Sequence, residues 1–310
     1  MSLLLYPHLD RYRSTTQGKY TGRVAVVYPC ERTSLEAAAQ VWQLGLSHVT
    51  LVGPRLRIQE LADLADLDIS GLALLETPDD PLAAAQAAVD LVRDGGATAI
   101  MKGSLHTDEL LGVVVRRDSG LRGSRRLSHA FLFDIPGLDR PILVTDCVLN
   151  IAPDLAAKRD IAQNAIDLAH QLGISTPSVA VLSATESVNP SMQSSLDAAA
   201  LSKMADRGQI TGGMVDGPLG FDNAVSSDSA SLKGIRSQVA GRPDILLVPS
   251  LDTGNVLYKC LVYMSKAACA GLVLGASVPI ILTSRSDTCF SRTSSAALAA
   301  HIQTQNGDHR

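Results

Sequence analysis

Four segments of this chain place glycines, small hydroxyls, amides and single cations directly after apolar runs. One of them, Ser284-Arg285-Ser286-Asp287, follows the run Val-Pro-Ile-Ile-Leu. The other three carry these candidate ligand-binding residues: Lys102, Gly103 and Thr107; Asp222 and Asn223; Gly254, Asn255 and Lys259. Such runs are typical of buried strands, and ligands of parallel α/β sheets bind beyond the carboxyl ends of the strands. We therefore expect the four segments to converge on a ligand.

These residue types suit a phosphate group. Glycine lets backbone N–H groups approach an anion at a helix N-terminus, and an arginine fork can hold two phosphate oxygens. A carboxylate two residues from that arginine would stay ionised and could act as a base. Each feature alone also has a structural explanation: a turn at Gly254-Asn255, a surface lysine at Lys259, a loop ion pair between Arg285 and Asp287, and a helix cap at Asp222-Asn223.

The elements that would position these residues alternate along nearly the whole chain. Strands are expected at residues 23–28, 48–52, 97–101, 141–145, 178–182, 245–248 and 279–283, and helices at 34–44, 81–94, 158–172, 191–207 and 231–239. We expect Ser34 to cap its helix, Gly254-Asn255 to open one, and residues 267–283 to hold a helix end, a turn and a strand. Strands that alternate with helices imply right-handed crossovers. The predicted class is α/β, with mostly parallel sheets covered by helices on both faces.

Composition narrows the class of function. The chain has 310 residues, of which 46% are hydrophobic, so two compact lobes are expected. A net charge of -4 argues against binding to nucleic acid or a membrane surface. Five cysteines without CxxC or zinc-like spacing indicate neither a disulfide scaffold nor a metal site, and a cytoplasmic location fits best. Neither a signal peptide nor a membrane span is expected.

Several side chains have two interpretations. The arginines at positions 116, 117, 122, 125 and 126 are either a solvated loop or a basic rim that attracts a phosphate-bearing ligand. His106 and His129 near strand ends, and Cys147, are more simply structural residues than catalysts. The signatures of P-loop enzymes, Rossmann dinucleotide-binding proteins, zincins and α/β-hydrolases are missing.

Seven segments in order make the sequence similar to the phosphate acetyltransferase and phosphate butyryltransferase family, and more so to its butyryl-type branch. They are MKGSLHTDELL (101–111), LSHAFLFDIPG (127–137), TDCVLNIAPDLAAKRDIAQNAIDLAHQLGI (145–174), VAVLSATESVNPSM (179–192), DGPLGFDNAVS (216–226), GNVLYK (254–259) and GASVPIILTSRSD (275–287). The similarity runs from about residue 95 almost to the last residue. The first 90 residues match only in pattern.

The resemblance implies a two-lobed architecture of the isopropylmalate dehydrogenase-like type, in a homodimer or larger assembly. We expect residues 1–130 with 272–310 to form one lobe and residues 131–271 the other, with the active site in the cleft between them. Members transfer an acyl group reversibly between coenzyme A, which is a substrate rather than a bound cofactor, and inorganic phosphate. The resemblance also adds Ser128 to the substrate-binding residues named above.

By this resemblance, Ser284 and Arg285 occupy the catalytic Ser-Arg positions. The acetyl branch has an aspartate base farther along, where this chain has Ser291, so the nearest acid, Asp287, is the candidate base. Arg285 would hold the phosphate, while Ser284 and backbone N–H groups near Gly254 would donate to the carbonyl oxygen. No metal is needed for this chemistry.

Two other classes of function stay open. A metal- and NAD-dependent decarboxylating dehydrogenase would need clustered aspartates, for which Asp216 and Asp222 are the nearby pair. A non-catalytic acyl-CoA-binding protein would bind the thioester without turning it over.

Overall fold

The computed structural model describes residues 5–20, 22–282 and 287–307. Contacts divide the chain into two compact units, which are described separately. Unit 1 comprises Met1–Ser124 and Cys269–Arg310, and unit 2 comprises Arg125–Ala268. The lobe boundaries given above and the interlobe location of the site stay predictions.

The sheet of unit 1 is built on the predicted apolar runs. Its strand order is β3-β2-β1-β4-β11-β10, and all neighbours are parallel except β10 and β11. The strands are β1 (Arg23–Val27), β2 (His48–Gly53), β3 (Ala73–Glu76), β4 (Ala99–Lys102), β10 (Ala268–Leu274) and β11 (Ile280–Ile281). The inner strands β1 and β4 are almost wholly buried, because helices cover both faces.

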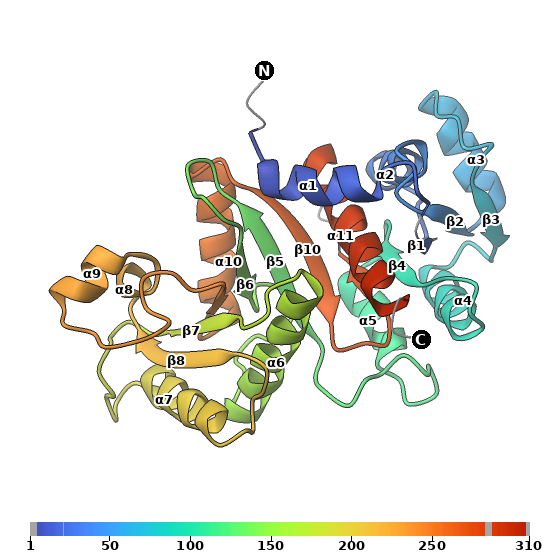
Figure 1. The fold of residues 1–310 in the computed structure, drawn as a ribbon. Coiled ribbons are helices and arrows are strands. Elements are labelled where there is room, and N and C mark those ends of the chain that lie inside the picture. Colours follow the sequence, from blue (N-terminus) through green and yellow to red (C-terminus); the bar gives the residue numbers. More distant parts are fainter. Residues whose placement is uncertain (1–4, 21, 283–286, 308–310) are drawn as a thin grey trace. The chain divides into compact units, whose positions relative to one another are not determined.

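The helices of unit 1 are α1 (Pro7–Thr16), α2 (Arg32–Gln43), α3 (Arg55–Leu64), α4 (Pro81–Arg93), α5 (Thr107–Val114) and α11 (Cys289–Gly307). The crossovers through α2 and α3 run in one direction along the sheet, and the crossover through α4 returns. Right-handed connections therefore place α2 and α3 on one face and α4 on the other. Helix α1 packs against α11, and the two cross in Figure 1.

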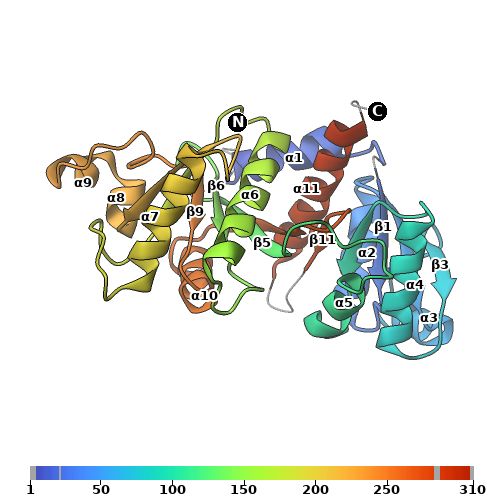
Figure 2. The same cartoon turned by 90° about the horizontal axis from the view of Figure 1, so that it is seen from below.

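Unit 2 repeats the same plan. Its strand order is β5-β6-β9-β7-β8, with only β5 and β6 antiparallel. The strands are β5 (Ser128–Asp134), β6 (Ile142–Thr145), β7 (Ser178–Leu182), β8 (Met214–Leu219) and β9 (Ile245–Leu247). The helices are α6 (Leu155–Gln171), α7 (Gln193–Asp206), α8 (Phe221–Val225), α9 (Ser227–Leu232) and α10 (Leu251–Lys259), which continues as a π-helical turn, η1 (Cys260–Met264). Figure 2 shows α6 and α7 side by side. The predicted α/β class is confirmed.

Four local predictions are wrong. The predicted helix over 231–239 does not form, because α9 ends at Leu232 and Gly234 turns the chain with φ +66°. The predicted helix end in residues 267–283 is missing from the described part of that range, 267–282, where strand β10 lies instead. Ser34 is inside α2, which follows Glu31 as its N-cap. Gly254 and Asn255 do not open α10, which begins at Leu251 with its N-cap Ser250 accepting from the Thr253 N–H.

Candidate active site

Ser284 and Arg285, the predicted catalytic pair, lie outside the described residues. The candidate base, Asp287, is described and half-buried, just before α11. It lies near the buried thiol of Cys269. Burial raises the pKa of Cys269 to about 12, and the charge of Asp287 adds to the rise. Cys269 is therefore a protonated, inert thiol beside the candidate base.

Lys102, Gly103 and Thr107 lie together in unit 1, at the carboxyl end of β4. The ammonium of Lys102 donates to the carbonyl oxygens of Gly103 and Leu105, each at 3.2 Å. A Cβ on Gly103 would lie 2.2 Å from the Val27 carbonyl oxygen, so this position requires glycine for its packing against β1. Thr107 is half-buried and begins α5.

A polar cluster that sequence reasoning missed lies beyond the ends of β1, β2 and β3. The Tyr28 hydroxyl donates to the Asp79 carboxylate at 2.5 Å. The Arg57 guanidinium donates to the Tyr28 oxygen at 2.7 Å and to Asp79 at 3.0 Å. Burial and the hydrogen bond to Asp79 raise the pKa of Tyr28 to about 12. The cluster joins two loops and helix α3, three segments far apart in the sequence, which explains why no local pattern indicated it.

In unit 2, Ser128, Gly254 and Asn255 gather around the loop that follows β6. A Cβ on Gly254 would lie 2.7 Å from the Asp146 carbonyl oxygen and 2.9 Å from the Cys147 Cα, so α10 touches this loop backbone to backbone. Asn255, the next residue, is half-buried. Lys259 is exposed at the last position of α10.

The buried carboxylate of Asp146 organises this loop. One oxygen accepts from the backbone N–H groups of Val148 and Leu149, both at 2.9 Å. The other accepts from the Asn150 side chain at 2.6 Å and from the His129 backbone N–H at 3.2 Å. Four donors therefore satisfy a carboxylate that is only 2% exposed. Asp146 was missed as a functional position, although it directly follows a predicted strand.

His129 is fully buried, and neither of its ring nitrogens has a hydrogen-bond partner among the residues that the structure describes. The ring packs edge-on against Phe131, with centroids 4.4 Å apart. Burial lowers the pKa of His129 to about 4, and the nearby Asp146 opposes the shift. The imidazole is therefore neutral near pH 7.

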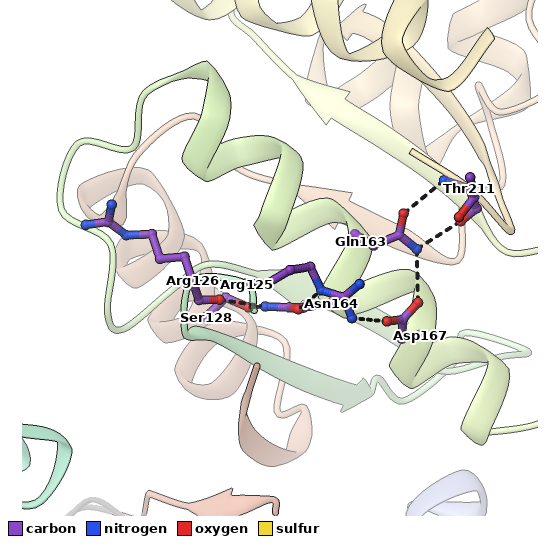
Figure 3. Close-up of polar contacts among 7 residues, drawn as sticks. All are labelled: Arg125, Arg126, Ser128, Gln163, Asn164, Asp167 and Thr211. Carbon is purple, nitrogen blue, oxygen red and sulfur yellow. Dashed lines mark hydrogen bonds and ion pairs between the residues drawn. The ribbon is translucent and has the colours of Figure 1, made fainter. Parts of the chain in front are cut away.

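Ser128 is held by a network that reaches across unit 2 to α6 (Figure 3). The Asn164 side chain donates to the Ser128 hydroxyl and to the Arg126 carbonyl oxygen, each at 2.9 Å. Its oxygen accepts from Arg125, whose guanidinium is also paired with Asp167. Gln163 extends the network to Asp167 at 2.9 Å and to both backbone groups of Thr211. Since Ser128 is buried and bonded within the protein, its hydroxyl positions the start of β5.

Asp222 and Asn223 lie in the short helix α8, beyond the end of β8. Asn223 is fully buried, and its amide donates to Glu186 at 3.3 Å. Asp222 is exposed and accepts from Ser229 at 2.8 Å and from Lys233 at 3.2 Å. These contacts lower the pKa of Asp222, the hydrogen bond from Ser229 most. The pair thus fastens α8 to α9.

Three backbone N–H groups at the start of α10 are engaged. The N–H of Leu251 donates to the Ile151 carbonyl oxygen at 3.1 Å. Thr253 donates to the Ser250 hydroxyl at 3.4 Å, and Gly254 to the Ser250 carbonyl oxygen at 3.1 Å. A ligand bound near Gly254 would therefore be stabilised by the helix dipole and not by hydrogen bonds from these N–H groups.

Other features of the described residues lie apart from this chemistry. A depression of about 370 Å³ is lined by Tyr20, Gly22, Arg23, His48, Thr98 and Gln303, at the amino ends of β1 and β2, whereas ligands of parallel sheets bind at the carboxyl ends. In the part of the chain that the structure describes, no three His, Cys, Asp or Glu side chains are grouped as metal ligands. Nor does any helix described there have the length and apolarity to cross a membrane.

Comparisons with known proteins agree on one family. The protein-family model described as Phosphate acetyl/butaryl transferase matches residues 78–300 of this chain. A phosphate acetyltransferase from Rhizobium meliloti is 47% identical over 291 residues, which are 94% of this chain and 92% of the relative. A phosphate butyryltransferase from Clostridium beijerinckii is 41% identical over 299 residues, 96% of this chain and 99% of the relative.

Solved structures give the same result for the fold. A branched-chain phosphotransacylase from Enterococcus faecalis superposes with a TM-score of 0.80 at 30% identity, covering 91% of this chain and 98% of that one. A 4-hydroxythreonine-4-phosphate dehydrogenase from Klebsiella pneumoniae superposes with a TM-score of 0.54 at 14% identity, covering 91% and 99%. The second likeness concerns the fold alone, and it agrees with the predicted dehydrogenase-like architecture.

Proposed function

Because the chain belongs to the phosphate acetyl/butyryl transferase family, we propose that it is an acyltransferase that moves a short acyl group reversibly between coenzyme A and inorganic phosphate. The observation that carries the proposal is the similarity to named transferases of both branches, at 40% identity or more over nearly the full length of the chain. The predicted family is thereby confirmed. The identities do not favour its butyryl-type branch, because phosphate acetyltransferases from Rhizobium meliloti and Rickettsia felis are 47% and 48% identical and the two clostridial phosphate butyryltransferases 41% and 40%.

In the acyl-phosphate-forming direction, a phosphate oxygen attacks the thioester carbonyl carbon. A tetrahedral intermediate forms, the carbon–sulfur bond breaks, and coenzyme A leaves as a thiolate that takes up a proton. In the reverse direction the thiol must lose that proton, and with a pKa of about 8.5 it is only a few per cent ionised at pH 7.

The proposed roles of the chain's own residues follow from these charges. Asp287 accepts the thiol proton in the reverse direction, and Arg285 holds the phosphate. Ser284 donates to the carbonyl oxygen as negative charge develops on it. Lys102, Gly103 and Thr107 of unit 1, and Gly254 and Asn255 of unit 2, are proposed to bind other parts of the substrates.

The test measures thiol release from acetyl-, propionyl-, butyryl- and valeryl-CoA with inorganic phosphate. Arg285→Ala should lose roughly 100-fold or more in kcat/KM, the scale of one preorganised donor, while Arg207→Ala, which removes an exposed arginine next to α7, should match the wild type. Near-normal turnover in Arg285→Ala would remove that residue from the mechanism.

Asp287→Asn should lower kcat strongly and abolish the acidic limb of its pH profile. An unchanged profile would assign the base elsewhere. Calorimetric binding of acyl-CoA without turnover by the wild type would favour a non-catalytic acyl-CoA-binding protein, and NAD reduction would favour a dehydrogenase. We also propose a homodimer in the cytoplasm, which size-exclusion chromatography with light scattering and fractionation of cells would test.

A further inference from the structure

Arg126 is fixed to unit 2 through both its backbone and its side chain. Its N–H donates to the Asp160 carboxylate at 3.1 Å, and its carbonyl oxygen accepts from Asn164 at 2.9 Å. Its Nε donates to the Asn150 side-chain oxygen at 2.7 Å. In Figure 3 its side chain extends away from the cluster of Arg125, Asn164 and Asp167. The guanidinium is therefore held in one place, apart from the carboxylate that pairs with Arg125.

The residue that anchors this guanidinium is itself buried. Asn150 is 7% exposed, and its amide nitrogen donates to the Leu127 carbonyl oxygen at 2.9 Å and to Asp146 at 2.6 Å. With both amide hydrogens used, its oxygen is left to accept from Arg126. These buried contacts fix the orientation of the Arg126 side chain. Arg126 therefore loses little side-chain entropy when it binds a ligand.

The charge of Arg126 is not compensated by any carboxylate that the structure describes. The arginines beside it differ in this respect: Arg125 is paired with Asp167, and Arg159 with Asp160 at 2.8 Å. The anchor of Arg126 is a neutral amide, and it occupies only Nε. The exposed side chain keeps its full positive charge and the N–H groups of both terminal nitrogens, which is the donor set that binds phosphate oxygens in pairs.

The loop after β6, whose Asn150 orients Arg126, also contacts α10. Ile151, the residue after Asn150, accepts the N–H of Leu251 at the start of that helix. At the other end of the loop, the Asp146 carbonyl oxygen packs against Gly254. Arg126 is therefore attached to the predicted substrate-binding segment, where the N–H groups of Leu251, Thr253 and Gly254 are already engaged and its own guanidinium adds unused donors.

We propose that Arg126 binds a phosphate group of the reactants, either inorganic phosphate or a phosphate of coenzyme A. The inference rests on the proposed function and extends it to a residue outside the predicted set. Of the two interpretations of the basic segment 116–126, this proposal gives Arg126 the role of binding a phosphate-bearing ligand.

The test compares Arg126→Gln with Arg207→Gln, a control that removes an exposed arginine next to α7 that has no part in the contacts holding Arg126. A lost charged hydrogen bond corresponds to roughly a ten- to hundred-fold rise in KM for the substrate whose phosphate is bound, and the control should stay within about two-fold of wild type. Arg126→Lys keeps the charge but loses the Nε anchor, so it should recover only part of the affinity.

The substrate whose KM rises in Arg126→Gln identifies the phosphate that Arg126 binds. A raised KM for inorganic phosphate alone assigns Arg126 to that substrate. A raised KM for acyl-CoA, with unchanged kinetics for an acyl-pantetheine that lacks the nucleotide phosphates, assigns it to coenzyme A. Unchanged constants for all three substrates, in a variant with wild-type circular dichroism and thermal midpoint, overturn the inference and leave the acyltransferase proposal standing.

Calorimetry separates the two proposals in the opposite case. If the wild type turns over no acyl-CoA, the proposed function fails. The binding of inorganic phosphate and of coenzyme A to the wild type, Arg126→Gln and Arg126→Lys still tests the inference, because weaker binding of one ligand to both variants supports it and equal binding overturns it.

Discussion

The backbone contact between α10 and the loop after β6 gives the sharpest prediction for stability. Alanine is better than glycine inside a helix by about 1 kcal/mol. At Gly254, however, the new Cβ would lie 2.7 Å from the Asp146 carbonyl oxygen, 2.9 Å from the Cys147 Cα and 3.0 Å from a Val248 methyl group. Two of these neighbours are backbone atoms, so the helix and the loop must separate. Overpacking of this kind costs about 1–3 kcal/mol.

Gly112 is the matched control for Gly254→Ala, because it also lies inside a helix, α5, and a Cβ built on it meets nothing within 4 Å. Gly112→Ala should stabilise the protein by about 0.5–1 kcal/mol. Since both variants gain the same helix propensity, the difference between them isolates the contact with the loop. We expect Gly254→Ala to be less stable than Gly112→Ala by about 1–3 kcal/mol.

The assay is urea denaturation followed by circular dichroism, with amide hydrogen exchange of α10 and of residues 146–151 to locate the effect. Exchange should accelerate in both segments in Gly254→Ala, and kcat/KM should fall. Equal stability of the two variants, with unchanged exchange, would refute the close approach of α10 to the loop after β6.

Two further predictions concern buried titratable groups. The pKa of His129 is lowered to about 4 in the folded protein, against about 6.5 unfolded. Between these two pKa values the unfolded state binds a proton that the folded state does not, so the free energy of unfolding decreases as the pH falls. His129→Leu should remove part of this decrease. The measurement is the thermal midpoint, which should drop less from pH 7.5 to pH 5 in the variant than in the wild type. Lys158 pairs with Asp197 at 2.6 Å, and both side chains are 6% exposed. Lys158→Met should destabilise the protein by about 3–5 kcal/mol, and adding Asp197→Leu should recover most of it in urea denaturation; a double variant no more stable than the single one would contradict this.

Central strands could be predicted from the sequence because their signal is local. The runs that form β1, β6, β7 and β9 are continuous and apolar, since both faces of each strand are covered. Edge strand β3 escaped prediction, because its four residues are all half-buried or exposed and carry no such run.

Strand β5 was missed for a different reason. It is buried throughout, yet it contains Ser128, His129 and Asp134. Polar residues at these positions interrupt an apolar run and favour a loop. One of them is accommodated by a partner distant in the sequence: the Asn164 side chain donates to the Ser128 hydroxyl. Such compensation is non-local, so the sequence alone does not reveal it.

The same limit applies to the site. Sequence spacing indicates which side chains follow the strands, and hence which edge of the sheet they occupy. It does not indicate whether their hydrogen-bonding groups are already used. Thus Ser128, Asn223 and Gly254, all predicted to bind substrate, have partners within the protein.

Arg126 shows the converse. In the sequence it is one of five arginines in a loop, with nothing to separate it from Arg125 beside it. In the fold, Asp167 neutralises Arg125, whereas a buried amide orients Arg126 and leaves its charge intact. The distinction depends on Asn150 and Asp167, which come from two different segments that follow β6. A residue that binds a ligand is therefore identified by the capacity that its neighbours leave unused, and that capacity is a property of the folded chain.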